Sequence, residues 1–554
     1  MLLIVATICT FIFLVAQRRI QRGNRHLPLP PGPPGEPLVG HLRVIPFEHP
    51  EFQYSRWAKE YNTEIREWYQ SRTKTHGLLI NNTKVHFNVL GRSIIILDTI
   101  EVAHELLDKR GAKYADRPRF VLFEVMGWGV TLTFLRWSRR FLLHRKLLQS
   151  SFTQSACKNY RPIQMGEARR AIRAIINDPD NWQAHLRQFS TASILRIGFG
   201  IEIQEKDDPF IKMTLDVEEA TGQGGVPAGS IVDFFPMLRY LPNGASCISK
   251  LFRPLAHARR TRQYIQQLHD APWESVEPSI RAGEQKPSFV HTHFGQYLAN
   301  EDTGKLNEAT IEDLKGMSAA ISIAGGNTTW STIIVCILGL LINPEALAKA
   351  RAELENVIGV DKDGDLLRLP TFEDRPRLKY LANVLYETTR WQPLSPLGVP
   401  HATLADDEYK GYRIPAGSVV YPNVRAMSRD MRHYSFPEEF RPERYEPTDK
   451  GGRGEPTPEG PFGFGRRRCP GEHLAMSGVY IMMSTLIATM DINCPTDADG
   501  NKIKPKVRFS DGLSGIPDTF CCRITPRSLR SEELLLISSA NIMTNLPNTR
   551  RDNM

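Results

Sequence analysis

One short segment constrains this chain more than its overall composition does. In the run PFGFGRRRCPGEHLA, residues 461–475, a single cysteine follows three arginines in a stretch rich in glycine. Pro470 comes directly after Cys469 and an apolar helical pattern follows, so we expect Cys469 at the N-cap of a helix. Backbone N–H groups and the helix dipole would lower the pKa of its thiol there. Because Gly463 and Gly465 also permit sharp turns, the loop is expected to present a thiolate.

A lone thiolate limits the kind of metal site that the loop can form. The chain has eight cysteines in 554 residues, and none of them has the CxxC spacing. A disulfide framework and a zinc module are therefore not expected, and the sparse cysteines favour a reducing compartment. With one soft ligand and no second, zinc is a poor fit, whereas a single axial thiolate suits haem iron.

The N-terminus has the composition of a membrane anchor. Its first residues, MLLIVATICTFIFLVAQ, carry no charged side chain, and the basic run RRIQRGNRH follows them. A cleaved signal peptide is the alternative, but the charges of a signal peptide precede its apolar run. We expect residues 1–17 to cross the membrane once, with the arginines on the cytosolic side. Residues 18–41 are expected to form a basic and proline-rich linker, because proline prevents helix formation.

The rest of the chain predicts one large domain, residues 42–527, that is mainly α-helical with small β-sheets. Residues 528–554 are polar and are expected to be disordered. The formal charge of +9 fits a diffuse basic surface, and the sequence contains no nucleic-acid-binding motif. Two short strands are expected within 85–98 and an amphipathic helix at 101–110. Longer helices are expected at about 141–174, 182–198, 308–342, 344–358, 376–391 and 471–490.

The cysteine loop also resembles a known family. The pattern F-x-x-G-x-R-x-C-x-G occurs as Phe462, Gly465, Arg467, Cys469 and Gly471, and it resembles the haem-binding loop of the cytochrome P450 family. The resemblance implies a P450 fold, here preceded by the N-terminal transmembrane helix, and haem b as the cofactor. It also implies that Cys469 is the axial iron ligand, that Arg467 pairs with a haem propionate, and that Phe462 shields the sulfur.

A second family feature is a Glu-x-x-Arg pair on a helix. YETTRW supplies Glu387 and Arg390, which lie one turn apart and so on one helical face. RPERY resembles the family's Pro-Glu-Arg-Phe segment, with Tyr445 in place of phenylalanine. The resemblance implies that Arg444 joins Glu387 and Arg390 in a charge network that supports the fold and takes no part in the chemistry.

A third feature is ISIAGGNTTWST, residues 321–332, within an apolar helical pattern. Taken alone, the adjacent glycines Gly325 and Gly326 favour a kinked core helix, because glycine costs about 1 kcal/mol relative to alanine in a helix. In register with the cysteine loop, the segment resembles the family's oxygen-activating helix. The resemblance implies that Gly325 lets the helix lie against the haem and that Thr328 guides protons. The family carries an acid before that threonine, whereas this chain has Asn327, which cannot relay a proton by ionising.

Two further segments resemble the family's haem edge. In MGWGVTLTFLRWSRRFLLHRKLLQ, the usual Trp-x-x-x-Arg maps to Phe141 and Arg145, which implies that Arg145 is a propionate partner. In PLGVPHAT, His401 could reach a propionate, and Leu397 and Val399 would face the substrate.

The resemblance covers roughly residues 28–527 and is closest to fungal microsomal members that serve secondary metabolism. Residues 63–83 have no counterpart in those members, so they are expected to be a surface insertion or a retained intron.

The function that the resemblance implies is a monooxygenase of the endoplasmic reticulum membrane, with its catalytic domain in the cytosol. Its expected partners are membrane lipid, a small hydrophobic substrate and NADPH-cytochrome P450 reductase, which passes on electrons from NADPH; nucleic acid is not expected. Two alternatives remain open. One is a haem-thiolate isomerase or dehydratase that needs no reductase, favoured by Asn327. The other is an impaired, non-catalytic member, favoured by the 63–83 segment and by the substitution at Phe141.

Overall fold

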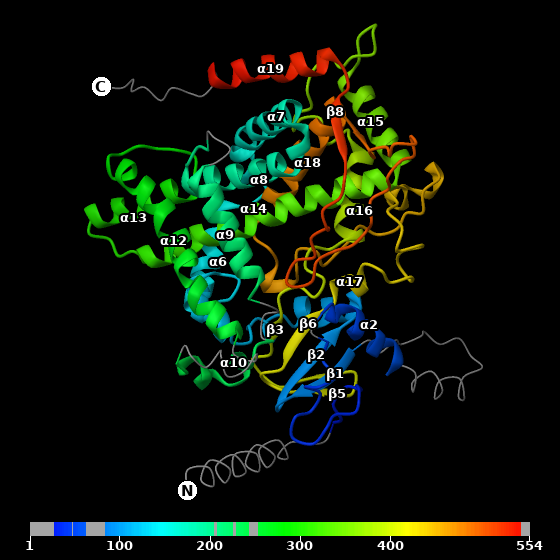
Figure 1. Cartoon of the computed structure of the whole chain (residues 1–554). Helices are drawn as coiled ribbons and strands as arrows, with labels where there is room; N and C mark the ends of the chain where they lie inside the picture. Colours follow the sequence, from blue (N-terminus) through cyan, green and yellow to red (C-terminus); the bar gives the residue numbers. More distant parts are fainter. Residues whose placement is uncertain are drawn as a thin grey trace, which may run out of the picture.

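The computed structural model describes residues 27–46, 48–61, 84–203, 208–224, 229–242 and 253–544. They form a mainly helical body with a small β-sheet at one end (Figure 1). The expected anchor at 1–17, the start of the linker and the expected insertion at 63–83 lie outside the described residues.

The largest sheet has four strands in the order β1-β2-β6-β3. β1 and β3 each pair antiparallel with their neighbours, whereas β2 and β6 run parallel. Residues 94–97 of β2 are continuously apolar because both faces of the strand are covered there: Ile94 and Ile96 pack with Trp57, while Ile95 and Leu97 pack with Leu106. The strands are β1 (Lys84–Val89), β2 (Arg92–Leu97), β3 (His401–Ala402), β6 (Val419–Pro422), and the two-stranded pairs β4 (Asp407–Tyr409) with β5 (Tyr412–Ile414) and β7 (Met490–Asn493) with β8 (Arg523–Pro526).

Helices account for most of the body. The α-helices are α2 (Pro50–Glu60), α4 (Ile100–Ala103), α5 (Val121–Met126), α6 (Arg139–Ser151), α7 (Arg161–Asn177), α8 (Trp182–Phe199), α9 (Pro209–Gly222), α10 (Ile231–Phe234), α12 (Arg253–Arg281), α13 (Phe289–Asp302), α14 (Ile311–Ile342), α15 (Pro344–Ile358), α16 (Lys379–Trp391), α17 (Val424–Met427), α18 (Glu472–Thr489) and α19 (Leu529–Thr544). The short 3-10 or π segments are η1 (His104–Lys109), η2 (Trp128–Val130), η3 (Ala156–Tyr160), η4 (Pro179–Asn181), η5 (Pro236–Tyr240), η7 (Pro442–Tyr445), η8 (Thr448–Lys450) and η9 (Gly465–Arg467).

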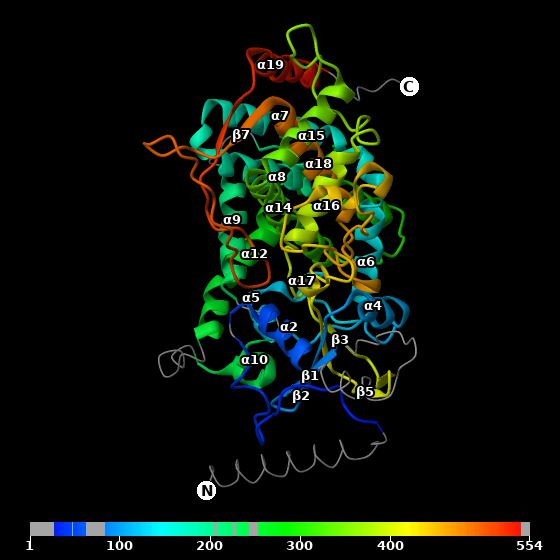
Figure 2. The same cartoon turned by 90° about the vertical axis from the view of Figure 1, so that its right-hand side faces the viewer.

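Helix α14 runs through the centre of the helical body and carries the segment that resembles the oxygen-activating helix (Figures 1 and 2). It begins with a capping box, in which the Thr310 side chain accepts from the backbone N–H of Asp313 and the Asp313 side chain accepts from that of Thr310. Among the described residues it is the helix that is long and apolar enough to span a membrane, but it is mostly buried inside the protein. It is therefore a core helix, and most of its apolar surface packs against neighbouring elements such as α8 and α18.

Two expectations about the helices were wrong. The single helix expected at about 141–174 is divided into α6 and α7, with a turn and η3 between them; Pro162 lies in the first turn of α7, where it needs no backbone donor. The tail after Arg527 is also not wholly disordered, because Leu529–Thr544 form helix α19. Leu535 is fully buried in the core and its carbonyl accepts from Arg173 of α7, so apolar contact holds this segment despite its polar composition.

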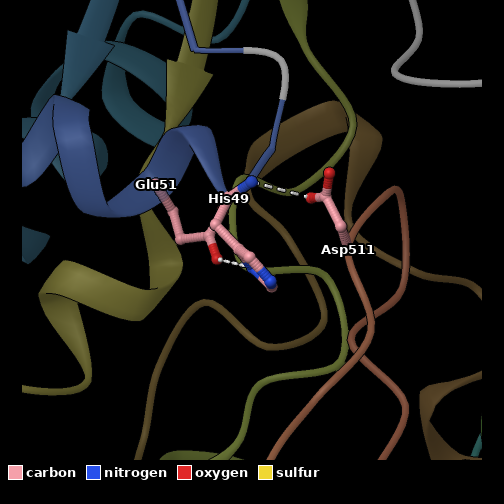
Figure 3. A group of neighbouring side chains, drawn as sticks. All are labelled: His49, Glu51 and Asp511. Atoms are coloured by element: carbon pink, nitrogen blue, oxygen red, sulfur yellow. Dashed lines mark hydrogen bonds and ion pairs between the residues drawn. The ribbon is translucent and has the colours of Figure 1, made fainter.

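The start of α2 meets a loop from the C-terminal part of the chain (Figure 3). His49 is the N-cap of α2 and has a left-handed backbone with φ of 46°. Its backbone N–H donates to Asp511 Oδ1 at 3.0 Å, and its ring Nδ1 lies 3.2 Å from Glu51 Oε1. These contacts fasten α2 to the loop that precedes β8.

Candidate functional site

The cysteine loop has the tight backbone that its glycines predict. The backbone N–H of Cys469 donates to the carbonyl of Phe462 at 2.8 Å, which closes the loop on itself. Gly465 has φ of 51°, and a Cβ at this position would lie 2.1 Å from the carbonyl oxygen of Leu107. Only glycine permits this approach, so the loop is pinned against η1.

Cys469 is not at the helix N-cap, which corrects the expectation from sequence. Pro470 and Gly471 form a turn, Gly471 is the N-cap, and α18 begins at Glu472. Burial raises the pKa of the Cys469 thiol, and a hydrogen bond from the backbone N–H of Gly471 opposes that shift. The side chain nevertheless keeps accessible surface, although protein packs densely around it. Accessible surface and dense packing occur together when a thiol lines an internal space. A bound cation such as iron would be needed there to favour the thiolate.

Two buried arginines and a buried histidine converge beside this loop. Arg467 donates through Nε to Ala115 O at 2.6 Å and through Nη1 to Leu135 O at 2.9 Å, but its buried Nη2 has no hydrogen-bond partner among the described residues. Burial lowers the pKa of Arg467 to about 9. Burial, with Arg117 and then Arg467 adding to it, lowers the pKa of His401 to about 3.

Sequence reasoning missed Arg117. Its Nη1 donates to the carbonyls of Val399 at 2.6 Å and Pro400 at 2.8 Å, while its buried Nε has no partner in the described part of the chain. Burial, together with Arg467, holds its pKa well below the usual range. The chain has 70 lysines and arginines, and nothing in the sequence distinguishes Arg117 from the others. What distinguishes it is that the folded chain buries its side chain. Two buried guanidinium groups, each with an unpaired N–H, need anions, and haem propionates have the matching chemistry.

Phe141 and Arg145 of α6 both contact the cysteine loop. Phe141 is buried and lies under the guanidinium of Arg467, with Cζ 3.7 Å from the ring centroid. The phenylalanine therefore lacks an N–H donor but offers a cation–π contact in its place. Arg145 donates through Nη1 to the backbone carbonyl of Arg468 and through Nε to Gln149 Oε1 at 3.1 Å. Burial lowers the pKa of Arg145, and the negative form of the nearby Cys469 opposes that shift.

The three predicted residues of α14 lie on one continuous α-helix, Ile311–Ile342. Thr328 Oγ1 donates to the carbonyl of Ala324 at 2.5 Å. Asn327 Oδ1 lies 3.5 Å from Ser331 Oγ, at the limit of a hydrogen bond. Ala324 is exposed although most of this helix is buried, so its side of the helix borders accessible space. At Gly325, a Cβ would lie 2.5 Å from Ile194 Cδ1, which explains the need for a small residue.

The apolar residues expected to face a substrate lie in two places. Val399 is half-buried and packs with the cluster that contains Phe120, Phe123 and Ile323 of α14. Leu397 packs with Tyr54 and the other residues beside the sheet, and its substrate-facing position stays a prediction.

The charge network predicted behind the site is formed. Glu387 is fully buried and accepts from Nε and Nη2 of Arg390, each at 2.8 Å, and from Nε of Arg444 at 3.1 Å. The hydroxyl of Tyr445, the residue that replaces phenylalanine, donates to Glu387 Oε2 at 2.9 Å, and the backbone N–H of Arg441 donates to Oε1 at 2.7 Å. The carboxylate is thus surrounded by donors on both oxygens.

Comparisons with known proteins agree with this geometry. Residues 82–514 match the family described as cytochrome P450, so the chain belongs to the cytochrome P450 family. Its curated relatives include cytochrome P450 monooxygenase 176 of Postia placenta, 32% identical over 98% of both chains. Tryptamine 4-monooxygenase of Psilocybe cyanescens is 32% identical over 95% of this chain and 98% of its own. Cytochrome P450 monooxygenase claR of Ampulloclitocybe clavipes is also 32% identical, over 95% and 90%. The family resemblance and the enzyme class, a cytochrome P450 monooxygenase, are confirmed. The role of each site residue stays a prediction.

Proposed function

We propose that this protein is a haem-thiolate monooxygenase that transfers one oxygen atom of O2 to a small hydrophobic molecule, with electrons from NADPH delivered by NADPH-cytochrome P450 reductase. We further propose a place in fungal secondary metabolism, because its relatives are fungal monooxygenases. The observation that carries the proposal is the pair of buried arginines, Arg117 and Arg467, beside one accessible cysteine; each has one guanidinium nitrogen without a hydrogen-bond partner among the described residues.

The residues present fit haem b. Cys469 would ligate the iron, and Arg467, Arg117, His401 and Arg145 would hold the propionates. Haem held by a thiolate supplies the activation of dioxygen. Phe462 closes the loop through its carbonyl and thereby orients Cys469.

Around this group, α14 supplies the small side chains and the hydroxyl of the site. Ala324 keeps the accessible side of the helix narrow, and Gly325 lets the helix pack against Ile194 of α8. The Thr328 hydroxyl can pass a proton toward the oxygen that leaves as water. Asn327 can orient a water molecule with its amide. The half-buried Val399 and the phenylalanines near it offer an apolar surface, which suits a hydrophobic substrate.

We also propose that residues 1–17 anchor the protein in the endoplasmic reticulum membrane, with 18–41 as a linker, residues 42–527 as the cytosolic catalytic domain and 63–83 as an insertion. Exposed apolar side chains support a membrane-facing end: Leu38 lies in the linker, Val44 follows it, and Met237 and Tyr240 follow α10. Both segments lie at the sheet end of the molecule (Figures 1 and 2).

The test is the carbon monoxide difference spectrum of the reduced, purified protein. We expect a band near ~450 nm, typical of thiolate-ligated haem. Cys469→Ser should lose that band and all NADPH-dependent oxidation, whereas the control Cys521→Ser, at another exposed cysteine, should keep both. A Cys469→Ser protein that kept the band would overturn the proposal. Turnover without NADPH and reductase would favour an isomerase, and purification without haem would favour a non-catalytic member.

A further inference from the structure

A buried carboxyl group outside the predicted site lies against the middle of α14. Glu218 of α9 exposes only 8% of its side chain, and its Oε2 lies 3.9 Å from Nη2 of Arg187. Its other oxygen, Oε1, is buried and has no hydrogen-bond partner among the described residues. That oxygen lies 3.7 Å from the point where a Cβ on Gly326 would be. Thr191 Oγ1, also buried and unpaired within the described chain, lies 3.6 Å from the same point.

The helical periodicity of α14 connects this carboxyl group with Thr328. Successive residues of an α-helix are turned by about 100°. Gly326, beside Glu218, is therefore turned by about 200° from Thr328, and Asn327 lies between the two. Asn327 is half-buried and Thr328 shares the accessible side of the helix with Ala324. Asn327 thus borders both the Glu218 side and the Thr328 side of α14.

The packing of α9 supports the same placement. Met213 and Val217 of α9 belong to one apolar cluster with Ala319 and Ile323 of α14. Residues 319, 323 and 327 follow one another at intervals of four along one helical ridge. Helix α9 therefore runs along the ridge of α14 that leads to Asn327. Glu218 follows Val217 on α9 and lies beside Gly326, the residue before Asn327.

The surroundings of Glu218 poise it for proton transfer. Burial raises the pKa of the Glu218 carboxyl group to about 7, and the positive charge of Arg187 on α8 opposes this shift. Arg187 is itself held 3.9 Å over the ring of Trp330 on α14. Gly326, the residue of α14 that lies against Glu218, has no ionisable group, and Arg187 is the charged group that acts on the titration of Glu218.

We propose that Glu218 is the proton-relay residue of this enzyme, and that it supplies through Asn327, water and Thr328 the protons that a neighbouring acid on α14 would otherwise deliver. The inference rests on the proposed monooxygenase function. That reaction, RH + O2 + 2e⁻ + 2H⁺ → ROH + H2O, takes its electrons from NADPH and consumes two protons at a buried site. In each transfer the Glu218 O–H bond breaks, its proton moves along the relay to the departing oxygen atom, and the carboxylate regains a proton from solvent. Asn327 holds the bridging water and does not ionise.

The experiment compares Glu218→Gln with the matched control Glu219→Gln, which changes the next, exposed carboxyl group of the same helix. All proteins are tested as haem-loaded full-length chains with reductase. Glu218→Gln should reduce product formation by about 10²-fold, the lower range of general acid catalysis, because water and Thr328 remain. Hydrogen peroxide released per NADPH should rise.

The wild-type rate should fall as pH increases through about 7, because only the protonated acid donates, whereas the variant should lose this pH dependence. Glu218→Asp should restore part of the product formation and part of the pH dependence.

A spectroscopic readout is independent of turnover. In infrared spectra of the resting protein recorded as pH rises, the wild type and Glu219→Gln should each lose more protonated-carboxyl C=O intensity near pH 7 than Glu218→Gln does. Asp98, whose pKa burial also raises to about 7, contributes the same intensity to all three proteins and cancels from this difference. Absence of such a titration in the wild type overturns the inference even if a variant fails to fold. The inference is also overturned if Glu218→Gln releases as much hydrogen peroxide per NADPH as the wild type and keeps its pH profile. In either case the proposed function stands as long as the wild type shows the ~450 nm band and reductase-supported oxidation. A wild-type protein without the ~450 nm band would overturn the proposed monooxygenase function itself.

Discussion

Two buried glutamates of this protein each face an arginine, but they differ in how far they are satisfied. Glu387 accepts hydrogen bonds on both oxygens from Arg390 and Arg444, and no part of it is exposed. Glu218 lies 3.9 Å from Arg187, has one oxygen without a partner in the described chain, and has a pKa raised to about 7. A fully bonded charge holds the fold together, whereas a poorly bonded one remains able to exchange a proton at neutral pH.

The largest expected effect comes from breaking the satisfied carboxylate. Glu387→Gln would leave the buried guanidinium groups of Arg390 and Arg444 without their counter-charge, so we expect the free energy of unfolding to fall by about 3–5 kcal/mol. Urea unfolding and haem content after purification measure this. Tyr445→Phe is the control, since it removes one donor to the same carboxylate and should cost about 1 kcal/mol. Equal losses from the two variants would contradict a structural role of the charge.

The sequence predicted the features that depend on local spacing. The cysteine loop and the Glu387–Arg390 pair were found because their residues lie within one loop or one helical turn, where geometry follows from the chain itself. Arg117 and Glu218 were missed because their burial and unpaired atoms arise only when separate helices and loops pack. The thiol pKa of Cys469 was predicted in the wrong direction, because burial of the thiol arises only when the loop packs and outweighs the hydrogen bond from the backbone N–H of Gly471.

A smaller effect tests the unsatisfied glutamate through stability. The pKa of Glu218 is about 7 in the folded protein, against about 4.3 for an ordinary glutamate. The folded state therefore binds more protons than the unfolded state between these values, and the wild type should lose up to about 3 kcal/mol of stability as pH rises from about 4 to about 7. Glu218→Gln cannot titrate and should lack this loss.

The measurement is the difference in unfolding free energy between Glu218→Gln and wild type, taken at pH 5 and at pH 8. The variant should gain on the wild type between the two pH values, and any pH-independent cost of the substitution cancels. Glu219→Gln should show no such gain. A difference that stays constant with pH would mean that Glu218 is as well satisfied as Glu387, and the contrast between the two would fail.

The smallest expected effect distinguishes the two glycines on α14. Alanine in place of a helical glycine usually contributes about 1 kcal/mol. At Gly326 a new Cβ finds its nearest neighbours at 3.6–3.8 Å, an ordinary contact, so Gly326→Ala should fold and gain up to that amount. At Gly325 the Cβ would lie 2.5 Å from Ile194 Cδ1, so Ile194 must move, and Gly325→Ala should lose about 1–3 kcal/mol instead.

The same pair of variants sharpens the assignment of Glu218, because the methyl group of Gly326→Ala would lie against Glu218 Oε1 and remove water from it. The infrared midpoint of the carboxyl group should then move above its wild-type value, since further desolvation disfavours the charged form. Gly325→Ala points toward Ile194 of α8 and should leave that midpoint unchanged even where it lowers stability. A shift in Gly325→Ala but not in Gly326→Ala would place the titrating carboxyl group elsewhere than beside Gly326.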